Sequence, residues 1–121
     1  MRKLMAASLF LMAFFVNAKF IHPMDFDGSE AQKNEVIEYI KNSVKSDYCD
    51  RTLDMCQDII LRTMECKNFN AFKLATKATH RKIMDRVIKD HCQRDLNMCN
   101  YTVINIMYEE SLHSSDKSLA W

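Results

Sequence analysis

Four of the five cysteines stand in two pairs with the same spacing, and their thiols are the groups best suited to chemistry in this chain. The segment DYCDRTLDMC at residues 47–56 returns as DHCQRDLNMC at residues 90–99. Cys49 and Cys56 are thus matched by Cys92 and Cys99 after an offset of 43 positions. Cysteines in such pairs can act as nucleophiles, hold a metal ion or form disulfides, and the neighbouring residues distinguish these roles.

Catalytic and metal-binding roles find little support in the nearby histidines and acidic residues. His91 precedes Cys92, but neighbours on a helix point about 100° apart and do not form a nucleophile pair. His80 and His91 lie on one predicted helix with no carboxylate at ligand spacing. In DFDGSE, Gly28 comes fourth, whereas a calcium loop needs its glycine sixth. We therefore predict no catalytic residue, metal ligand or cofactor, and no enzyme.

The elements that carry the cysteines are predicted to be helices. Pro23 and Gly28 are the only proline and glycine, so the rest of the chain lacks the residues on which β-hairpins depend. Apolar residues recur at intervals of three and four, and Ser29 is a suitable N-cap for the first helix. We predict helices over residues 30–49, 55–66, 71–92 and 98–111, with a break at KNFN (67–70). The last helix is predicted to bury Cys99, Val103, Ile106 and Met107.

The repeat is wider than the cysteine segments, because Ile40 aligns with Ile83 and Val44 with Val87 on the same offset. Each half reads as a helix, a cysteine-bounded corner and a second helix, in repeat one at about 36–66 and in repeat two at about 79–109. Two such units can bury their apolar stripes against each other. We predict an all-α fold, a small disulfide-stapled four-helix bundle built from two pseudo-repeated αα-hairpins.

Two disulfide arrangements fit this plan. If Asp47 and Asp90 were N-caps, each cysteine pair would lie within one helix about 10.5 Å apart, beyond disulfide reach, and bridges would have to join the two repeats. If instead Asp54 and Asn97 cap the following helices, local bonds Cys49–Cys56 and Cys92–Cys99 close the two corners. The apolar periodicity continues up to the first cysteine of each pair, which favours the local bonds.

The N-terminus has the pattern of a secretory signal. Arg2 and Lys3 precede an apolar run that ends before Val16-Asn17-Ala18, which predicts a signal peptide at residues 1–18 with cleavage after Ala18. The run is short for a transmembrane helix. Cleavage would leave 15 basic and 16 acidic residues, a balance that gives no footprint for nucleic acid. We expect a secreted, extracellular protein, an environment in which its thiols oxidise.

The mature chain then divides into three parts. An extended N-terminal arm covers residues 19–29, a single helical domain residues 30–112, and a frayed tail residues 113–121. The arm carries apolar side chains that must fold over the bundle or dock elsewhere, and Arg51 and Arg94 lie in the two corners. The possible partner contacts are therefore Phe20, Ile21, Met24, Phe26, Arg51 and Arg94.

Two further positions are open to modification. Cys66 has no counterpart in the repeat, since Glu109 aligns with it, and an odd cysteine in an exported chain is either a buried thiol or a disulfide to a second subunit, giving a homodimer. Asn100-Tyr101-Thr102 matches the N-glycosylation pattern. Asn100 follows Cys99 directly in a predicted helix, which limits access to it.

The cysteine patterns resemble those of two families. The Cys49-x6-Cys56 spacing in a small exported helical chain resembles the first cysteine pair of insect chemosensory proteins, whose second pair is more closely spaced than Cys92 and Cys99. The duplicated pairs are similar in plan to the bicycle family of aphid salivary effectors, although no tyrosine lies between the paired cysteines of this chain. The first resemblance implies carriage of a small apolar molecule, and the second an effector.

The function expected from the sequence is binding rather than catalysis. The chain combines an export signal, predicted cross-links and a polar surface, so we expect a secreted non-enzymatic protein that binds a macromolecular target, as an effector, toxin, venom or salivary component, or helical signalling factor. The target would be an extracellular protein. The alternative is an extracellular carrier of a small apolar ligand, held among the six methionines that remain after cleavage.

Overall fold

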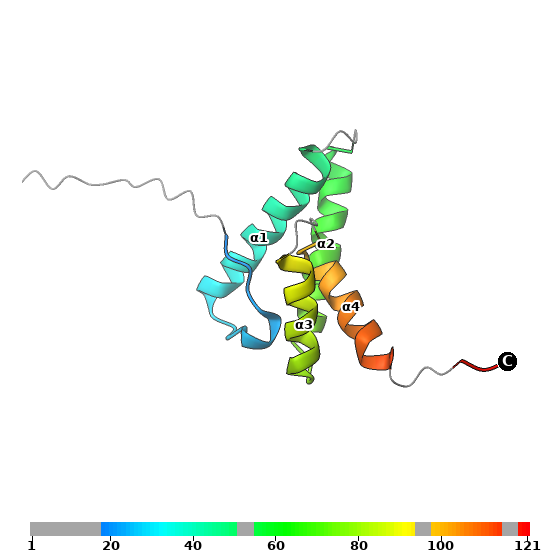
Figure 1. Cartoon of the computed structure of the whole chain (residues 1–121). Helices are drawn as coiled ribbons and strands as arrows, with labels where there is room; N and C mark the ends of the chain where they lie inside the picture. Colours follow the sequence, from blue (N-terminus) through cyan, green and yellow to red (C-terminus); the bar gives the residue numbers. More distant parts are fainter. Residues whose placement is uncertain (1–17, 51–54, 94–97, 115–118) are drawn as a thin grey trace, which may run out of the picture.

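The computed structural model describes residues 18–50, 55–93, 98–114 and 119–121. In these residues the protein is entirely helical and has no strand. A short 3₁₀ turn, η1 (Pro23–Asp25), precedes α1 (Glu30–Cys49), α2 (Asp58–Ala75), α3 (Arg81–Cys92) and α4 (Tyr101–Ser114). The predicted all-α fold is confirmed, and the arrangement is consistent with a four-helix bundle (Figure 1).

Helix α1 begins and ends where the sequence pattern predicts. The Ser29 hydroxyl accepts a hydrogen bond from the Gln32 amide at 3.2 Å, which satisfies one of the free N–H groups at the helix start. Val36, Ile40 and Val44, spaced by four, form its buried stripe. The helix therefore rests on the core along one line of side chains and ends at Cys49.

The predicted break at residues 67–70 is wrong, because α2 continues through it to Ala75. Asn68, which favoured a break in the sequence, is buried on the same face as Ala71, Phe72 and Ala75. Its side-chain N–H donates to the Met64 carbonyl at 2.9 Å, and its carbonyl accepts from the Thr102 amide of α4 at 3.4 Å. Since its polar group is satisfied inside the core, Asn68 extends the helix rather than ending it. The chain turns at residues 76–80 instead.

The predictions for α4 are wrong in both its start and its buried face. The Asn100 side-chain oxygen accepts from the Val103 amide at 2.9 Å, so the helix begins after this cap rather than at residue 98. The buried residues are Tyr101, Ile104 and Tyr108, whereas Ile106 and Met107 are 53% and 37% exposed. The sequence offered two apolar stripes on this helix, and the one with the tyrosines lies in the core.

The two cysteine corners are closed locally, as predicted. Cys49 is bonded to Cys56 and Cys92 to Cys99, with Cα–Cα distances of 4.6 and 4.5 Å. Asp47 and Asp90 lie inside α1 and α3 rather than at helix starts, so the alternative with bridges between the repeats is wrong. The predicted caps Asp54 and Asn97 lie outside the described residues.

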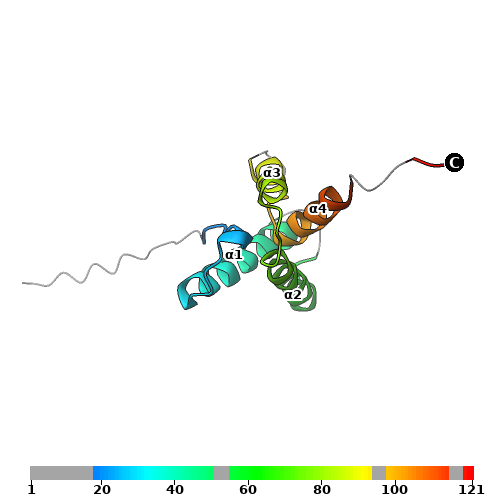
Figure 2. The ribbon, with the colours of Figure 1, turned by 90° about the horizontal axis from the view of Figure 1, so that it is seen from below.

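The helices pack in series, and the N-terminal arm (residues 19–29) adds a fifth element. The main contacts join α1 to α2, α2 to α4 and α4 to α3, while η1 packs against α2. Figure 1 shows the arm between α1 and α3, and Figure 2 shows α2 and α3 on opposite sides of α4. The arm thus lies between α1 and α3, which are the two ends of this series of helices.

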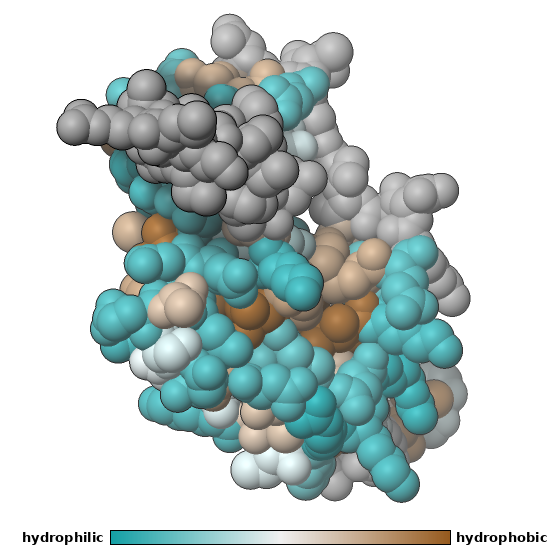
Figure 3. All heavy atoms as spheres, turned by 90° about the vertical axis from the view of Figure 1, so that its left-hand side faces the viewer, coloured by the Kyte–Doolittle hydropathy of each residue, from teal (hydrophilic) through white to brown (hydrophobic). Residues whose placement is uncertain are grey.

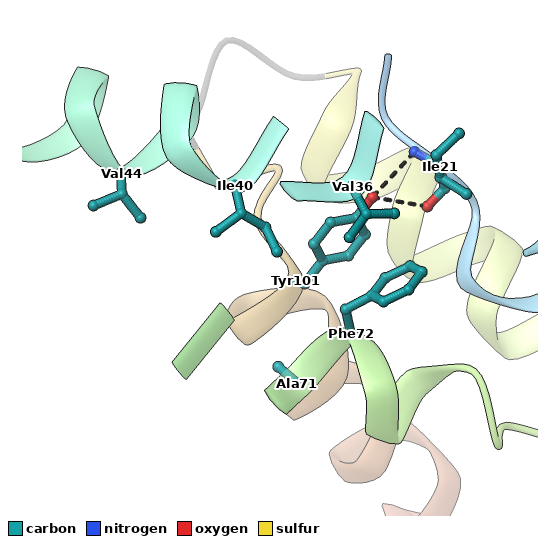
Figure 4. Packing of buried hydrophobic residues seen from close by; sticks show 7 residues of the cluster. All are labelled: Ile21, Val36, Ile40, Val44, Ala71, Phe72 and Tyr101. Carbon is teal, nitrogen blue, oxygen red and sulfur yellow. Dashed lines mark hydrogen bonds between the residues drawn. The ribbon is translucent and has the colours of Figure 1, made fainter. Parts of the chain in front are cut away.

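The core consists of two clusters that meet at the arm. The first contains Ile21, Val36, Ile40, Val44, Ala71, Phe72 and Tyr101, which Figure 4 shows converging from the arm, α1, α2 and α4. The second contains Ala75, Met84, Val87, Ile104 and Tyr108. Phe20 packs against both clusters, so the arm helps to join the two halves of the molecule.

The predicted signal peptide lies outside the described residues up to position 17. Among the described helices, none has the length and apolar character that crossing a membrane requires. At the other end α4 includes His113 and Ser114, and the last three residues, 119–121, are exposed.

Candidate functional site

An apolar stripe on α4 faces outward and is the first candidate binding surface. We define the outer face of α4 as Val103, Ile106 and Met107, which lie at the i, i+3 and i+4 positions of one helix surface. Ile106 is the most exposed of the three, and the three side chains belong to neither core cluster. In Figure 2, α2 and α3 flank α4, and no described helix covers its side away from α1.

Two buried tyrosines explain why α4 turns this stripe outward. The Tyr101 hydroxyl accepts from the Ile21 amide and donates to the Ile21 carbonyl, both at 3.0 Å. The Tyr108 hydroxyl accepts from the amides of Thr79 and His80 at 3.2 and 3.1 Å. Burial also raises the pKa of the Tyr101 phenol well above its ordinary value. These bonds fix the rotation of α4 about its axis.

The second candidate surface is a groove between α1 and α2, which we call the α1/α2 groove. It is a hollow of about 210 Å³ lined by Ile37, Ile40, Lys41, Glu65, Cys66 and Phe69. Its surface is almost entirely apolar. Towards the Cys49–Cys56 bond it continues into a more polar hollow that shares Lys41 and Glu65. The groove therefore joins an apolar end to a charged one.

Cys66 lies in this groove with a free, exposed thiol. The interpretation of Cys66 as a buried thiol is therefore wrong. Its position on α2 is three residues before Phe69 and next to Glu65, on a flank of the helix that does not face the core. The homodimer through Cys66 stays a prediction, and the thiol is placed where another molecule can reach it.

The second half of the molecule has a hollow at the equivalent position. It lies between α3 and α4, and His80, Ile83 and Leu112 occupy the positions that Ile37, Ile40 and Phe69 hold in the first half. This hollow is larger, about 360 Å³, but polar and apolar groups contribute equally to its surface. Glu109 aligns with Cys66 and approaches His113 at 3.5 Å. The two hollows thus share three aligned positions and differ in volume and in chemistry.

The apolar arm residues predicted as partner contacts pack mainly on the bundle. Ile21 is buried, and Phe20 contacts the rings of Tyr39 and Tyr101 at centroid distances of 5.4 and 5.0 Å. Phe26 packs edge-on against the Phe72 ring at 5.1 Å, and Met24 packs against the second cluster. Their role towards a partner is untested, but their side chains serve the fold first. Figure 3 shows apolar atoms in recesses between hydrophilic ones on the side of the molecule that α1 and the arm occupy.

Polar contacts attach the arm to α3. Arg81 donates two hydrogen bonds to the Asp25 carboxylate, at 2.6 and 2.8 Å, and this bonding holds the pKa of Asp25 below its ordinary value. The His22 ring contacts the Asp85 carboxylate at 2.7 Å. The other His22 ring nitrogen accepts from the Met24 amide, which starts η1. Sequence patterns could not pair these residues, since they are more than 50 positions apart.

The remaining predicted positions are placed as follows. Asn100 is half-buried and acts as the N-cap of α4, and its glycosylation stays a prediction. Arg51 and Arg94 lie outside the described residues. Cys92 is bonded to Cys99, and Nδ1 of the His91 ring contacts the backbone carbonyl oxygen of Val87 at 2.8 Å. Across the described residues, no three His, Cys, Asp or Glu side chains gather closely enough to hold a metal ion.

Comparison with known proteins found no matching family, no similar curated protein and no similar solved structure. The resemblances to chemosensory proteins and to aphid effectors therefore rest on the cysteine spacing alone. At the level of class, the chain is an all-helical protein with two local disulfides.

Proposed function

We propose that this chain is an exported, non-enzymatic protein that acts by binding another extracellular protein through the outer face of α4. Such a protein would serve as an effector, a venom or salivary component, or a helical signalling factor. Two disulfides in a small domain support export, because such bonds persist in oxidising compartments. The single observation that carries the proposal is the apolar stripe of α4 that the core does not use.

The outer face of α4 has the pattern of a helix that docks in a groove. Partners of this kind recognise apolar side chains at i, i+3 and i+4 on one helix, which is the spacing of Val103, Ile106 and Met107. Solvation of such a stripe is unfavourable, and its burial contributes roughly 25 cal/mol for each Å² removed from water. The partner expected from this chemistry has an apolar groove that accommodates slightly more than one helical turn, about 6 Å along the helix axis.

Charge adds a constraint on the partner. Glu109 and Glu110 follow the stripe on α4, so its C-terminal end carries acidic groups. A partner whose groove has basic residues at the corresponding end would be favoured by complementary charge, chiefly through faster association. The same charges disfavour an acidic partner.

A carrier of a small apolar ligand is the weaker alternative. Ligand pockets have volumes of about 300–1,000 Å³ and mostly apolar walls. The apolar α1/α2 groove measures about 210 Å³, and the larger hollow between α3 and α4 has a mixed polar surface. No methionine lines either hollow, although methionines were the side chains expected to adapt to a ligand.

The test uses three versions of the protein as bait in extracellular fluid from the target tissue. These versions are the wild type and two single variants. Ile106→Asp places a charge in the outer face of α4, while Ile59→Asp makes the same change at a residue of α2 that is 74% exposed and lies away from that face. We expect one or a few proteins to be retained by wild type and Ile59→Asp and lost with Ile106→Asp. Equal retention by all three would overturn the proposal, as would uptake of a fluorescent fatty acid without any protein partner.

A further inference from the structure

We infer that the α1/α2 groove is an interface between two copies of this chain, and that a Cys66–Cys66 disulfide locks the resulting homodimer. This interface is separate from the outer face of α4, and the inference stands without the function proposed for that face. Four features of the groove support it: its apolar lining, its charges, its thiol, and its contrast with the equivalent hollow.

The residues that line the groove are mainly apolar, although the groove is open to solvent. Ile37 and Phe69 are 38% and 39% exposed and lie on opposite sides of the groove, on α1 and α2. Neither side chain belongs to a core cluster. Association with a molecule that removes these two side chains from water is favoured by the hydrophobic effect, because folding alone does not bury them.

The charges of the groove suit a second copy. Lys41 on α1 and Glu65 on α2 line the groove from opposite sides, and Glu65 also pairs with Arg62 of its own helix at 2.9 Å. In a twofold interface the same patch meets itself, with α1 of one copy opposite α2 of the other. Each Lys41 would then face Glu65 of the second copy, giving two equivalent ion pairs. An interface with charges of one sign would repel its own copy.

The thiol of Cys66 lies beside Glu65 in this patch, exposed and free. A residue near a twofold axis meets its own counterpart, so two Cys66 sulfur atoms can approach each other there. The other four cysteines are consumed in local disulfides, which leaves Cys66 without a partner in its own chain. An exported chain with an odd cysteine is expected to pair it with another chain.

The residues of the α1/α2 groove differ in chemistry from the residues at the aligned positions of the second half. Where the first half has Ile37, Cys66 and Phe69, the second has His80, Glu109 and Leu112 at the aligned positions. Of the two polar residues only His80 lines the second hollow, whose surface is polar and apolar in equal parts. Only the first hollow combines an apolar lining with a thiol.

Oxidation needs an acceptor, and a small-molecule disulfide such as oxidised glutathione supplies it. The Cys66 thiolate attacks one sulfur of this disulfide, forming a mixed disulfide and releasing one small thiolate. The Cys66 thiolate of the second copy attacks the Cys66 sulfur of that mixed disulfide, which breaks its bond and releases the second small thiolate. Two protein thiols become one disulfide, the reagent is reduced to two thiols after they take up the two protons, and the electrons balance.

The experiment measures the dimer directly in the whole chain, expressed in eukaryotic cells and purified from the medium or the cells, wherever it accumulates. After equilibration with oxidised and reduced glutathione, we expect twice the monomer mass without reductant and the monomer mass with it. Mass spectrometry should identify a Cys66–Cys66 peptide. A monomer under both conditions, or Cys66 recovered only as a mixed disulfide with glutathione, would overturn the inference.

Two sets of variants test whether the groove, and not merely a free thiol, directs the bond. Cys66→Ser combined with Glu109→Cys moves the thiol to the aligned, exposed position on α4, outside the α1/α2 groove, where we expect dimer formation about tenfold slower, equivalent to about 1.4 kcal/mol of lost complementarity. Lys41→Glu should slow the wild-type reaction, and Lys41→Glu with Glu65→Lys should restore it. Equal rates for both thiol positions, or no rescue by the charge swap, would show that the groove is not the interface.

A dimer of this kind would carry two outer faces of α4, a consequence that rests on the proposed function. Binding of one face raises the effective concentration of the other. The two claims fail separately, because Cys66→Ser abolishes the covalent dimer and keeps the outer face of α4, while Ile106→Asp does the reverse.

Discussion

The two halves of the molecule have the same corners and different hollows. Both corners are closed by a disulfide that joins cysteines seven positions apart. The first half, however, has the longer helices, of 20 and 18 residues against 12 and 14, and an apolar groove with a thiol, whereas the second half has a mixed, polar hollow. A duplicated hairpin can therefore retain its scaffold residues while the surfaces between its helices acquire separate chemistry.

Replacing the first residue of α4 should destabilise the fold far more than replacing the first residue of α2. Tyr101 at the start of α4 aligns with Asp58 at the start of α2, but Tyr101 is fully buried and Asp58 is exposed. Tyr101→Ala should lower the free energy of unfolding by about 3–5 kcal/mol, as for other large aromatic side chains in cores. Asp58→Ala should cost less than about 1 kcal/mol, through the helix dipole. Guanidinium unfolding followed by circular dichroism measures both, and similar losses would contradict the assignment of α4 to the core.

The next prediction tests the equivalence of the two corners. Replacing Cys49 and Cys56 together by serine should lower the free energy of unfolding by about 2.5 kcal/mol. The reason is that the unfolded chain regains the entropy that the short closed loop had removed. The Cys92 and Cys99 pair closes a loop of the same length, so its loss should be similar. Urea unfolding of the two double variants measures the difference. A much larger loss in one half would show that its disulfide has a further role in the packing.

Helices α1 and α3 should also differ in how they affect stability at alkaline pH. Burial, with a smaller contribution from the Asp47 charge, raises the pKa of Tyr39 from 10.0 to about 12. The folded state thus favours the neutral phenol, whose hydroxyl donates to the Cys99 carbonyl at 2.5 Å. The resulting stability is complete below pH 10 and is lost as the pH rises from 10 through 12.

The variant Tyr39→Phe should therefore flatten the fall in stability over this pH range, as measured by the thermal midpoint at each pH. Lys82, which is exposed on α3, occupies the aligned position and serves as the control. Lys82→Ala should leave the alkaline fall as in wild type. An unchanged fall in Tyr39→Phe would contradict the burial of its phenol.

The smallest effect concerns how the arm is held by each half. Aromatic contacts join it to the first half, and the Arg81–Asp25 pair joins it to the second. The hydrogen bonds from Arg81 lower the pKa of Asp25, so this pair stabilises the docked arm above the ordinary carboxyl pKa of 3.8, and the contribution is lost as the pH falls below it.

Arg81→Gln should make proteolysis of the arm modestly faster at neutral pH and less dependent on acidification. Arg86→Gln, a change at another exposed position of α3, serves as the matched control. Limited proteolysis at pH 7 and pH 3 measures the effect. Equal cleavage of both variants would show that the aromatic contacts alone hold the arm.

Local signals predicted much of this structure. The Ser29 cap, the stripe of α1 and the two disulfides depend on residues close in sequence, and all three were predictable. Asn68 misled the prediction of the second helix because its hydrogen-bond partner Thr102 lies 34 positions away. The buried face of α4 was missed because its two tyrosines are placed by hydroxyl contacts to the arm and to the α2–α3 turn.

The candidate surfaces were only partly predictable. The repeat singled out Cys66 as the odd cysteine, but its exposure depends on which flank of α2 faces α1. The outer face of α4 has the apolar spacing of a buried helix, so the sequence predicts it as part of the core. An apolar stripe in a sequence indicates that one face of a helix is unfavourable in water. Whether this chain or a partner covers that face depends on how the other helices pack.

The bond between Tyr101 and Ile21 also has a consequence for the order of folding. The arm is synthesised before the four helices, but the hydroxyl that holds it is 80 positions further along the chain. At elongation rates of about 5–20 residues per second, the arm waits roughly 4–16 s for its partner helix. Docking of the arm therefore follows synthesis of α4, and the long loop that it closes adds an entropic cost to this step.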